Sequence, residues 1–207
     1  MKRFRSIVTL AAITALGVAS VAVAATVTGT SDDDTLFGTP KRDTISGLAG
    51  GDRIIGLAGN DTIDGGRDDD TIAGDGSCPA GATTPAYCET DGRGNDRILG
   101  GSGEDTVDGD GGRDRISGES GDDRLRGNSG NDRISGGSGD DVVRGHAGAD
   151  RITGGSGRDS VAAGSGRDSI LIRDGARDRV TCGSGRDTVI ADRRDDVARN
   201  CERVRRR

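Results

Sequence analysis

The sequence contains very few aromatic and apolar side chains. Aromatic residues make up 1% of the chain, tryptophan is absent, and hydrophobic residues reach only 30%, against roughly 45–50% in ordinary globular domains. A conventional two-layer core is therefore excluded, because too little apolar area is present to offset the conformational entropy of the chain. Two interpretations are compatible with this composition: a disordered chain, or a repeat architecture in which each unit buries a single residue.

Long hydrophobic runs are also lacking, except at the N-terminus. There, Lys2, Arg3 and Arg5 precede an apolar stretch from Ile7 to Ala24, which ends in the small residues Ala22-Val23-Ala24. This pattern is typical of a cleavable secretory signal, and it predicts a secreted, extracellular protein that begins near Ala25. The alternative is an uncleaved membrane anchor. No other stretch is long and apolar enough to span a membrane after cleavage.

The charge balance disfavours nucleic acid as a partner. The formal net charge is −6, and removal of the basic signal segment makes the remaining chain more acidic still. An acidic protein repels phosphate backbones and attracts cations.

Four cysteines lie outside the signal segment: Cys78, Cys88, Cys182 and Cys201. An even number of cysteines in an exported chain predicts disulfides. Three pairings are compatible with the sequence, and we favour the local one, Cys78–Cys88 with Cys182–Cys201. Zinc is a weaker alternative, since the chain has no Cys-x-x-Cys motif and a single histidine.

Glycine and aspartate are abundant, and aspartate recurs with a nine-residue step. An aliphatic residue follows two positions after nearly every one of these aspartates, and a glycine usually precedes by two. Disorder does not require an apolar residue at a fixed phase, and glycine in every turn would cost a helix about 1 kcal/mol per residue. Each unit therefore predicts a turn followed by a short strand with alternating faces, as in Thr106-Val107-Asp108. The repeated aspartates are Asp34, Asp43, Asp52, Asp61, Asp70, Asp96, Asp105, Asp114, Asp123, Asp132, Asp141, Asp150, Asp159, Asp168, Asp178, Asp187 and Asp196.

The full pattern Gly-Gly-x-Gly-x-Asp occurs at Gly100–Asp105, Gly136–Asp141 and Gly154–Asp159. It resembles the RTX, or hemolysin-type, calcium-binding nonapeptide repeat, and the resemblance extends from Gly29 to Ala198. It implies an all-β fold, a right-handed parallel β-roll (a β-solenoid) with two nonapeptides per coil. The units at Asp34, Asp43, Asp178 and Asp196 lack the glycine two places earlier, and we expect poor sites or caps there.

The resemblance also implies that several Ca²⁺ ions lie between stacked turns, held by carboxylates and backbone carbonyls. Such oxygen ligands suit a hard cation that takes 6–8 of them. The carboxylates implied are those of Asp52, Asp61, Asp96, Asp105, Asp114, Asp123, Asp132, Asp141, Asp150, Asp159 and Asp168. The carbonyls implied include those of Gly101, Gly103, Gly137, Gly139, Gly155 and Gly157.

Elementary electrostatics then predicts that folding is coupled to calcium. Coils about 4.8 Å apart would bring equivalent carboxylates together with a repulsion of roughly 3 kcal/mol per pair at an effective dielectric constant near 20. Burial of one core residue contributes about 1.5–3 kcal/mol. The two effects nearly cancel, so a cation is needed to stabilise the fold.

The repeats and their interruptions divide the chain into five parts. We expect a signal peptide at 1–24, N-terminal repeats at 25–74, a disulfide-closed loop at 75–90, central repeats at 91–172, and degenerate repeats with a disulfide cap and a basic tail at 173–207. The loop carries Tyr87 and is either a tolerated insertion or a recognition loop.

Arginine sets this chain apart from the family pattern. Arg97, Arg115, Arg133 and Arg151 are eighteen residues apart, so a two-unit coil predicts that they form one row. The simpler interpretation is a solvated face, and the alternative is a site for an anionic cell-envelope polymer. Arginines also flank many repeat aspartates, where they could replace part of the calcium charge.

No catalytic constellation is present, and we expect no enzyme. The single histidine, His146, occupies a turn position that other units fill with glycine or a polar residue, and the aspartates are explained by the repeat. The leading prediction is a secreted calcium-binding roll. The alternative is a structural or adhesive envelope protein in which calcium only stiffens the scaffold.

Overall fold

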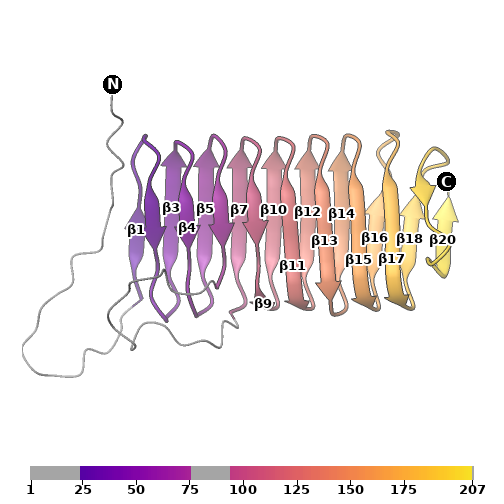
Figure 1. The fold of residues 1–207 in the computed structure, drawn as a ribbon, viewed down its shortest axis with the longest axis horizontal. Helices are drawn as coiled ribbons and strands as arrows, with labels where there is room; N and C mark the ends of the chain where they lie inside the picture. Colours follow the sequence, from indigo (N-terminus) through magenta and orange to yellow (C-terminus); the bar gives the residue numbers. More distant parts are fainter. Residues whose placement is uncertain (1–23, 76–93, 207) are drawn as a thin grey trace, which may run out of the picture.

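A computed structural model describes residues 24–75 and 94–206, and it shows an elongated β-solenoid whose strands lie side by side along its length (Figure 1). Every regular element in these two ranges is a β-strand, and they contain no helix that could cross a membrane. The strands form two parallel sheets, which we call sheet 1 and sheet 2.

Sheet 1 contains β1 (Thr26–Thr28), β3 (Thr44–Ala49), β5 (Thr62–Arg67), β7 (Arg97–Ser102), β10 (Arg115–Ser120), β12 (Arg133–Ser138), β14 (Arg151–Ser156), β16 (Ser169–Ile172), β18 (Thr188–Ala191) and β20 (Arg203–Arg206). Sheet 2 contains β2 (Thr35–Phe37), β4 (Arg53–Ile55), β6 (Thr71–Ala73), β8 (Thr106–Asp108), β11 (Arg124–Gly130), β13 (Val142–Ala147), β15 (Ser160–Gly166), β17 (Arg179–Gly185) and β19 (Asp196–Val197), and β9 (Gly111–Gly112) pairs with β11.

The strand register confirms the predicted β-roll with two nonapeptides per coil. Consecutive strands alternate between the sheets, and each strand pairs in parallel with the strand one coil later. Ile116, for example, lies opposite Ile134, and Leu125 lies opposite Val143. Identical positions of the repeat therefore stack in straight columns along the solenoid.

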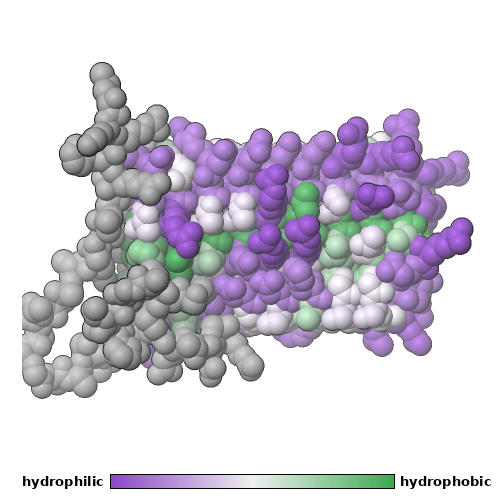
Figure 2. Space-filling view, viewed as in Figure 1, coloured by the Kyte–Doolittle hydropathy of each residue, from purple (hydrophilic) through white to green (hydrophobic). Residues whose placement is uncertain are grey.

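The core of most coils is one aliphatic residue wide in each sheet. The residue two positions after each repeat aspartate points inward and is almost fully buried, from Leu36 to Val189, while its neighbours face outward. In the C-terminal coils a second inward side chain joins the core, at Ala163, Ile172, Cys182 and Ala191. The exterior is mainly polar, and Figure 2 shows hydrophobic residues of one face gathered in an interrupted band along the long axis. Each unit thus buries little area alone, and stacking makes the core continuous.

Glycines are required in the turns for two physical reasons. Gly139 adopts a φ of 131°, in the left-handed region that other residues avoid. A Cβ at the same position would also lie 2.1 Å from the carbonyl oxygen of Gly121 in the preceding coil. The backbones of successive turns therefore approach too closely for any side chain here.

The interruption of the repeat is accommodated at one turn. Ile63 lies opposite Ile98 although they are 35 residues apart, so the coil closes normally around the insertion. Asp75, the first residue of the predicted loop, is buried, and its carboxylate accepts hydrogen bonds from the Gly94 backbone N–H at 2.9 and 3.0 Å. The predicted Cys78–Cys88 bridge lies outside the described residues.

The structure corrects the position of the last predicted unit. We placed its aspartate at Asp196 and its inward residue at Ala198, but Asp195 is the buried aspartate and Val197 lies opposite Val180. The shift by one residue brings valine instead of alanine against the core. Asp196 is exposed.

The roll extends beyond both ends of the family resemblance, which covers Gly29 to Ala198. At the N-terminus, Val27 pairs with Ile45 and adds one more inward residue. At the C-terminus, Val204 lies opposite Val189, so the basic tail forms strand β20, although its side chains are exposed. The predicted Cys182–Cys201 disulfide is present, with Cα atoms 5.2 Å apart.

Candidate metal centre

The repeat aspartates form two columns, one at the start of the strands of each sheet. We call them ladder 1 and ladder 2. Their side chains are buried because each aspartate turns inward immediately before the outward residue that opens its strand. Ladder 1 contains Asp43, Asp61, Asp96, Asp114, Asp132, Asp150, Asp168 and Asp187. Ladder 2 contains Asp34, Asp52, Asp70, Asp105, Asp123, Asp141, Asp159, Asp178 and Asp195.

One oxygen of each ladder carboxylate has a defined role. From Asp52 to Asp195, the Oδ1 atom accepts a hydrogen bond from the backbone N–H of the aspartate one coil earlier, whereas Asp43 Oδ1 accepts the Ala25 N–H and Asp34 Oδ1 has no partner in the two described ranges. The distance is 2.9 Å from Asp96 N to Asp114 Oδ1, and 2.9 Å from Asp105 N to Asp123 Oδ1. Each carboxylate that does so satisfies an N–H group that would otherwise be buried without a partner, and it links two coils.

The second oxygen has no partner among the described residues. Buried Oδ2 atoms without any hydrogen bond occur in Asp52, Asp61, Asp70, Asp96, Asp105, Asp114, Asp123, Asp132, Asp141, Asp150, Asp159, Asp168, Asp178 and Asp187. A buried polar atom without a hydrogen bond is costly, and a buried charge costs far more. Each of these fourteen carboxylates therefore has an acceptor that requires either a proton or a cation, whereas both oxygens of Asp43 and Asp195 accept backbone N–H groups.

The free oxygen lies beside an inward glycine, where backbone carbonyls and the apolar core meet. A Cβ added to Gly136 would meet both Asp141 Oδ2 and the carbonyl oxygen of Gly154 at 2.2 Å. Both oxygens therefore lie against the same glycine, which leaves no room for a side chain between them. A buried carboxylate oxygen without a donor favours a cation, and carboxylate and carbonyl oxygens are the ligands that calcium prefers.

The glycines whose carbonyl oxygens we predicted as calcium ligands also stack in columns along the solenoid. Gly137 and Gly139 both have positive φ, as do Gly155 and Gly157 one coil later. In this conformation a Cβ at Gly157 would lie 2.0 Å from the Gly139 oxygen, and one at Gly155 would lie 2.0 Å from the Gly137 oxygen. The carbonyls therefore point along the solenoid, from one turn toward the next.

Side chains alone do not assemble a metal site. The described residues contain no group of three or more histidine, cysteine, aspartate or glutamate side chains placed to hold an ion. Each turn contributes one ladder carboxylate, so a bound ion must take most of its ligands from backbone carbonyls. The residues present fit calcium on these terms, because calcium accepts carbonyl oxygens in flexible geometry.

Burial raises the pKa of the ladder carboxyls from Asp52 to Asp178. It raises the pKa of Asp61 and Asp114 to about 8, and that of Asp96 and Asp150 to about 7. Hydrogen bonds from the backbone oppose this rise, and neighbouring carboxylates such as Asp96 add to the rise at Asp61. Mutual repulsion, on which the sequence argument relied, is thus a smaller contribution than desolvation.

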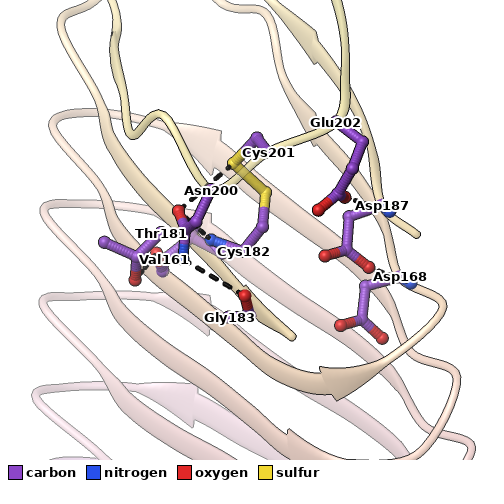
Figure 3. The surroundings of a disulfide bond; sticks show 9 residues. All are labelled: Val161, Asp168, Thr181, Cys182, Gly183, Asp187, Asn200, Cys201 and Glu202. Atoms are coloured by element: carbon purple, nitrogen blue, oxygen red, sulfur yellow. Dashed lines mark hydrogen bonds between the residues drawn. A yellow bond between two sulfur atoms is a disulfide. The ribbon is translucent and has the colours of Figure 1, made fainter. Parts of the chain in front are cut away.

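All eleven aspartates that we predicted as ligands lie in the ladders. Sequence reasoning left out Asp70, Asp178 and Asp187, whose Oδ2 atoms are unpartnered in the same way. The nine-residue step alone could have identified them. The step could not identify Glu202, whose carboxylate accepts a hydrogen bond from the Asp187 N–H at 2.8 Å. Glu202 thereby ends ladder 1 above Asp187 and Asp168 (Figure 3).

The arginines beside the ladders do not neutralise them directly. Within the described ranges, the one ion pair joins Arg126 to Asp108 at 3.7 Å, and neither residue belongs to a ladder. Where asparagine or aspartate precedes the repeat aspartate, its side chain accepts an N–H from the next coil, as Asn131 does from Ala149 at 2.7 Å. Arginine at this position has no acceptor to offer.

Comparison with known proteins agrees with this geometry. No curated protein matches the chain. A family model for the RTX calcium-binding nonapeptide repeat matches residues 28–56, 46–77, 90–116, 108–143, 117–152 and 135–170. These overlapping matches span more than half of the sequence and coincide with the stacked turns. The chain therefore belongs to the family of RTX calcium-binding nonapeptide repeat proteins.

Proposed function

We propose that this protein is a secreted calcium-binding roll in which Ca²⁺ ions lie between stacked turns and are required for folding. The observation that supports this proposal most is the row of buried, unpartnered Oδ2 atoms. A divalent cation would supply the positive charge that the described side chains do not provide. The carboxylates of both ladders and the carbonyls of turn glycines such as Gly101, Gly103, Gly137 and Gly139 would hold it.

The residues of the chain divide this work between them. The ladder Oδ1 atoms bind neighbouring backbones and fix the carboxylates in place. Inward strand glycines such as Gly118 and Gly136 lie against the Oδ2 atoms of Asp123 and Asp141 and leave no room for a side chain there. We propose no catalytic role, and His146 lies exposed in strand β13 with a φ of 71°.

Calorimetric titration of the purified secreted form with Ca²⁺ tests the proposal. We expect several ions per chain, and we expect Asp132→Asn to lower the number bound or their affinity at least tenfold. The matched control is Asp64→Asn, which removes the same charge from an exposed strand position outside the ladders. Equal binding by both variants and the native chain would refute the ladder carboxylates as ligands.

Secretion and purpose need a separate test. Expression with the N-terminal segment intact should yield a protein that begins near Ala25 and is recovered from the medium. Retention on the cell wall would instead favour the alternative, a structural or adhesive envelope protein.

A further inference from the structure

Four arginines form a continuous row on the outer surface of sheet 1. Arg97, Arg115, Arg133 and Arg151 open the strands β7, β10, β12 and β14, and each lies directly opposite the next in the parallel register. All four are exposed. We call them the arginine row. Because the coils are about 4.8 Å apart, the guanidinium groups lie along a line that follows the long axis.

The arginine row has no counter-charge from the described chain. None of its guanidinium groups forms an ion pair or a hydrogen bond with another described residue, whereas Arg126 on sheet 2 pairs with Asp108. Like charges directly opposite one another destabilise a sheet. The positions that flank the row carry Thr62 and Ser169, so the charged segment has definite ends.

Part of the row lines a basic groove with a volume of about 680 Å³. Its lining includes Arg133 and Arg151 of the row, and Arg113 and Arg167 of the adjacent turns. The aspartates at its base, Asp150 and Asp168, are buried and present little negative charge to a ligand. This surface therefore attracts anions although the protein as a whole is acidic.

Hydroxyl groups accompany the charges. Ser117, Ser135 and Thr153 lie two residues after the arginines and stack in the same register. In the described ranges the one aromatic residue is Phe37, far along the roll on β2, so the groove has no ring on which a nucleic-acid base could stack. Arginine and hydroxyl rows on a flat surface match the carboxylates and hydroxyls of a sugar polymer.

We infer that the arginine row and its groove bind a linear acidic polysaccharide, lying along the long axis of the roll with its carboxylates against successive guanidinium groups. Each guanidinium can hold a carboxylate by two parallel hydrogen bonds. Several weak contacts on one rigid surface add up to useful affinity.

The test uses the full secreted chain in saturating calcium with hyaluronate as the probe, at 50 mM and 300 mM salt. The row variant replaces Arg97, Arg115, Arg133 and Arg151 with Gln. The matched control replaces four arginines with Gln at exposed strand positions of sheet 2, which are Arg53, Arg124, Arg144 and Arg179. It therefore changes the net charge by the same amount. Circular dichroism verifies that both variants fold.

We expect the native chain to bind hyaluronate at 50 mM salt, with affinity falling steeply at 300 mM because the contacts are ionic. The row variant should lose at least tenfold in affinity and the control less than twofold. Equal losses, no binding by the native chain, or tighter binding to a single-stranded DNA of equal charge would each overturn the inference. Calcium titration of the row variant should be unchanged, which separates this test from that of the metal site.

Discussion

At the scale of single residues, the molecule is defined by aspartates that use their two oxygens differently. Asp114 Oδ1 accepts a backbone N–H, and its Oδ2 is buried without a partner. The hydrogen bond to Oδ1 stabilises the coil. The buried Oδ2 makes the stability of the coil depend on whether a proton or a cation is bound to it. One residue type thus links the fold to its proposed ligand.

Acidity should have opposite effects with and without calcium. The pKa of Asp61 and Asp114 is about 8 in the folded chain, against 3.8 for a free side chain. Groups with a raised pKa in the folded state stabilise it fully below pH 3.8, and this stabilisation is lost as the pH rises through about 6–8. In chelator, far-ultraviolet circular dichroism should therefore show more β-structure at pH 5 than at pH 8.5, and a urea transition should be present only at pH 5.

In saturating calcium the order should reverse, because the metal requires ionised carboxylates and protons compete with it. Circular dichroism and urea denaturation at both pH values, with and without calcium, check both halves. The account would be wrong if acid destabilised the calcium-free chain.

Close approach of the turns predicts different costs for two glycines. Gly139 and Gly175 both have positive φ, at 131° and 93°. A Cβ at Gly139 meets the Gly121 oxygen at 2.1 Å, whereas one at Gly175 meets nothing within 4 Å. Gly175→Ala should cost only the conformational penalty, about 1 kcal/mol.

Gly139→Ala should cost at least twice as much, because the turns must also move apart. Urea denaturation in saturating calcium measures both variants. Similar costs would mean that successive turns are not packed as closely as described.

At the scale of strands and coils, the last two coils carry the disulfide. Cys182 and Cys201 are both buried in the core and join β17 to the segment that precedes β20. Nineteen residues separate them, and a loop of this size contributes about 3 kcal/mol of restraint to the unfolded chain. The bridge therefore holds together the coils at the C-terminal end of the described roll.

Replacing both cysteines with alanine should therefore lower the unfolding free energy by about 3 kcal/mol. Amide hydrogen exchange should accelerate first in β17 to β20 and not in β3 to β7. If amide hydrogen exchange accelerated equally along the chain, the disulfide would not stabilise the last coils locally.

Periodicity predicted the strands well where the nine-residue step is regular. Ile98, Ile116, Ile134 and Ile152 all occupy the predicted inward position. It failed at the C-terminus, where Asp195 and Asp196 are adjacent and the step alone selects the wrong one. Only the packing of Val197 against Val180 decides between them.

The metal site was less accessible to sequence reasoning than the fold. The repeat identified most of the ladder aspartates. It did not show that one oxygen of Asp114 accepts a hydrogen bond from a backbone N–H. Nor did the sequence show that desolvation exceeds repulsion in raising the pKa of Asp61, because both depend on burial.

At the scale of the whole molecule, the stability of each coil depends on its two neighbours. Each coil contacts its two neighbours through parallel strands and through the ladder hydrogen bonds. Stability is then a sum of weak units and the interfaces between them. A change in the charge of the ladders therefore acts on the entire roll.

The central claim is tested most directly by far-ultraviolet circular dichroism of the purified secreted chain at pH 7.5, first in excess EDTA and then in millimolar calcium. The account predicts little β-structure in EDTA and a cooperative gain of β-signal, with a thermal transition, when calcium is restored. The same β-spectrum and the same melting temperature in both conditions would contradict it.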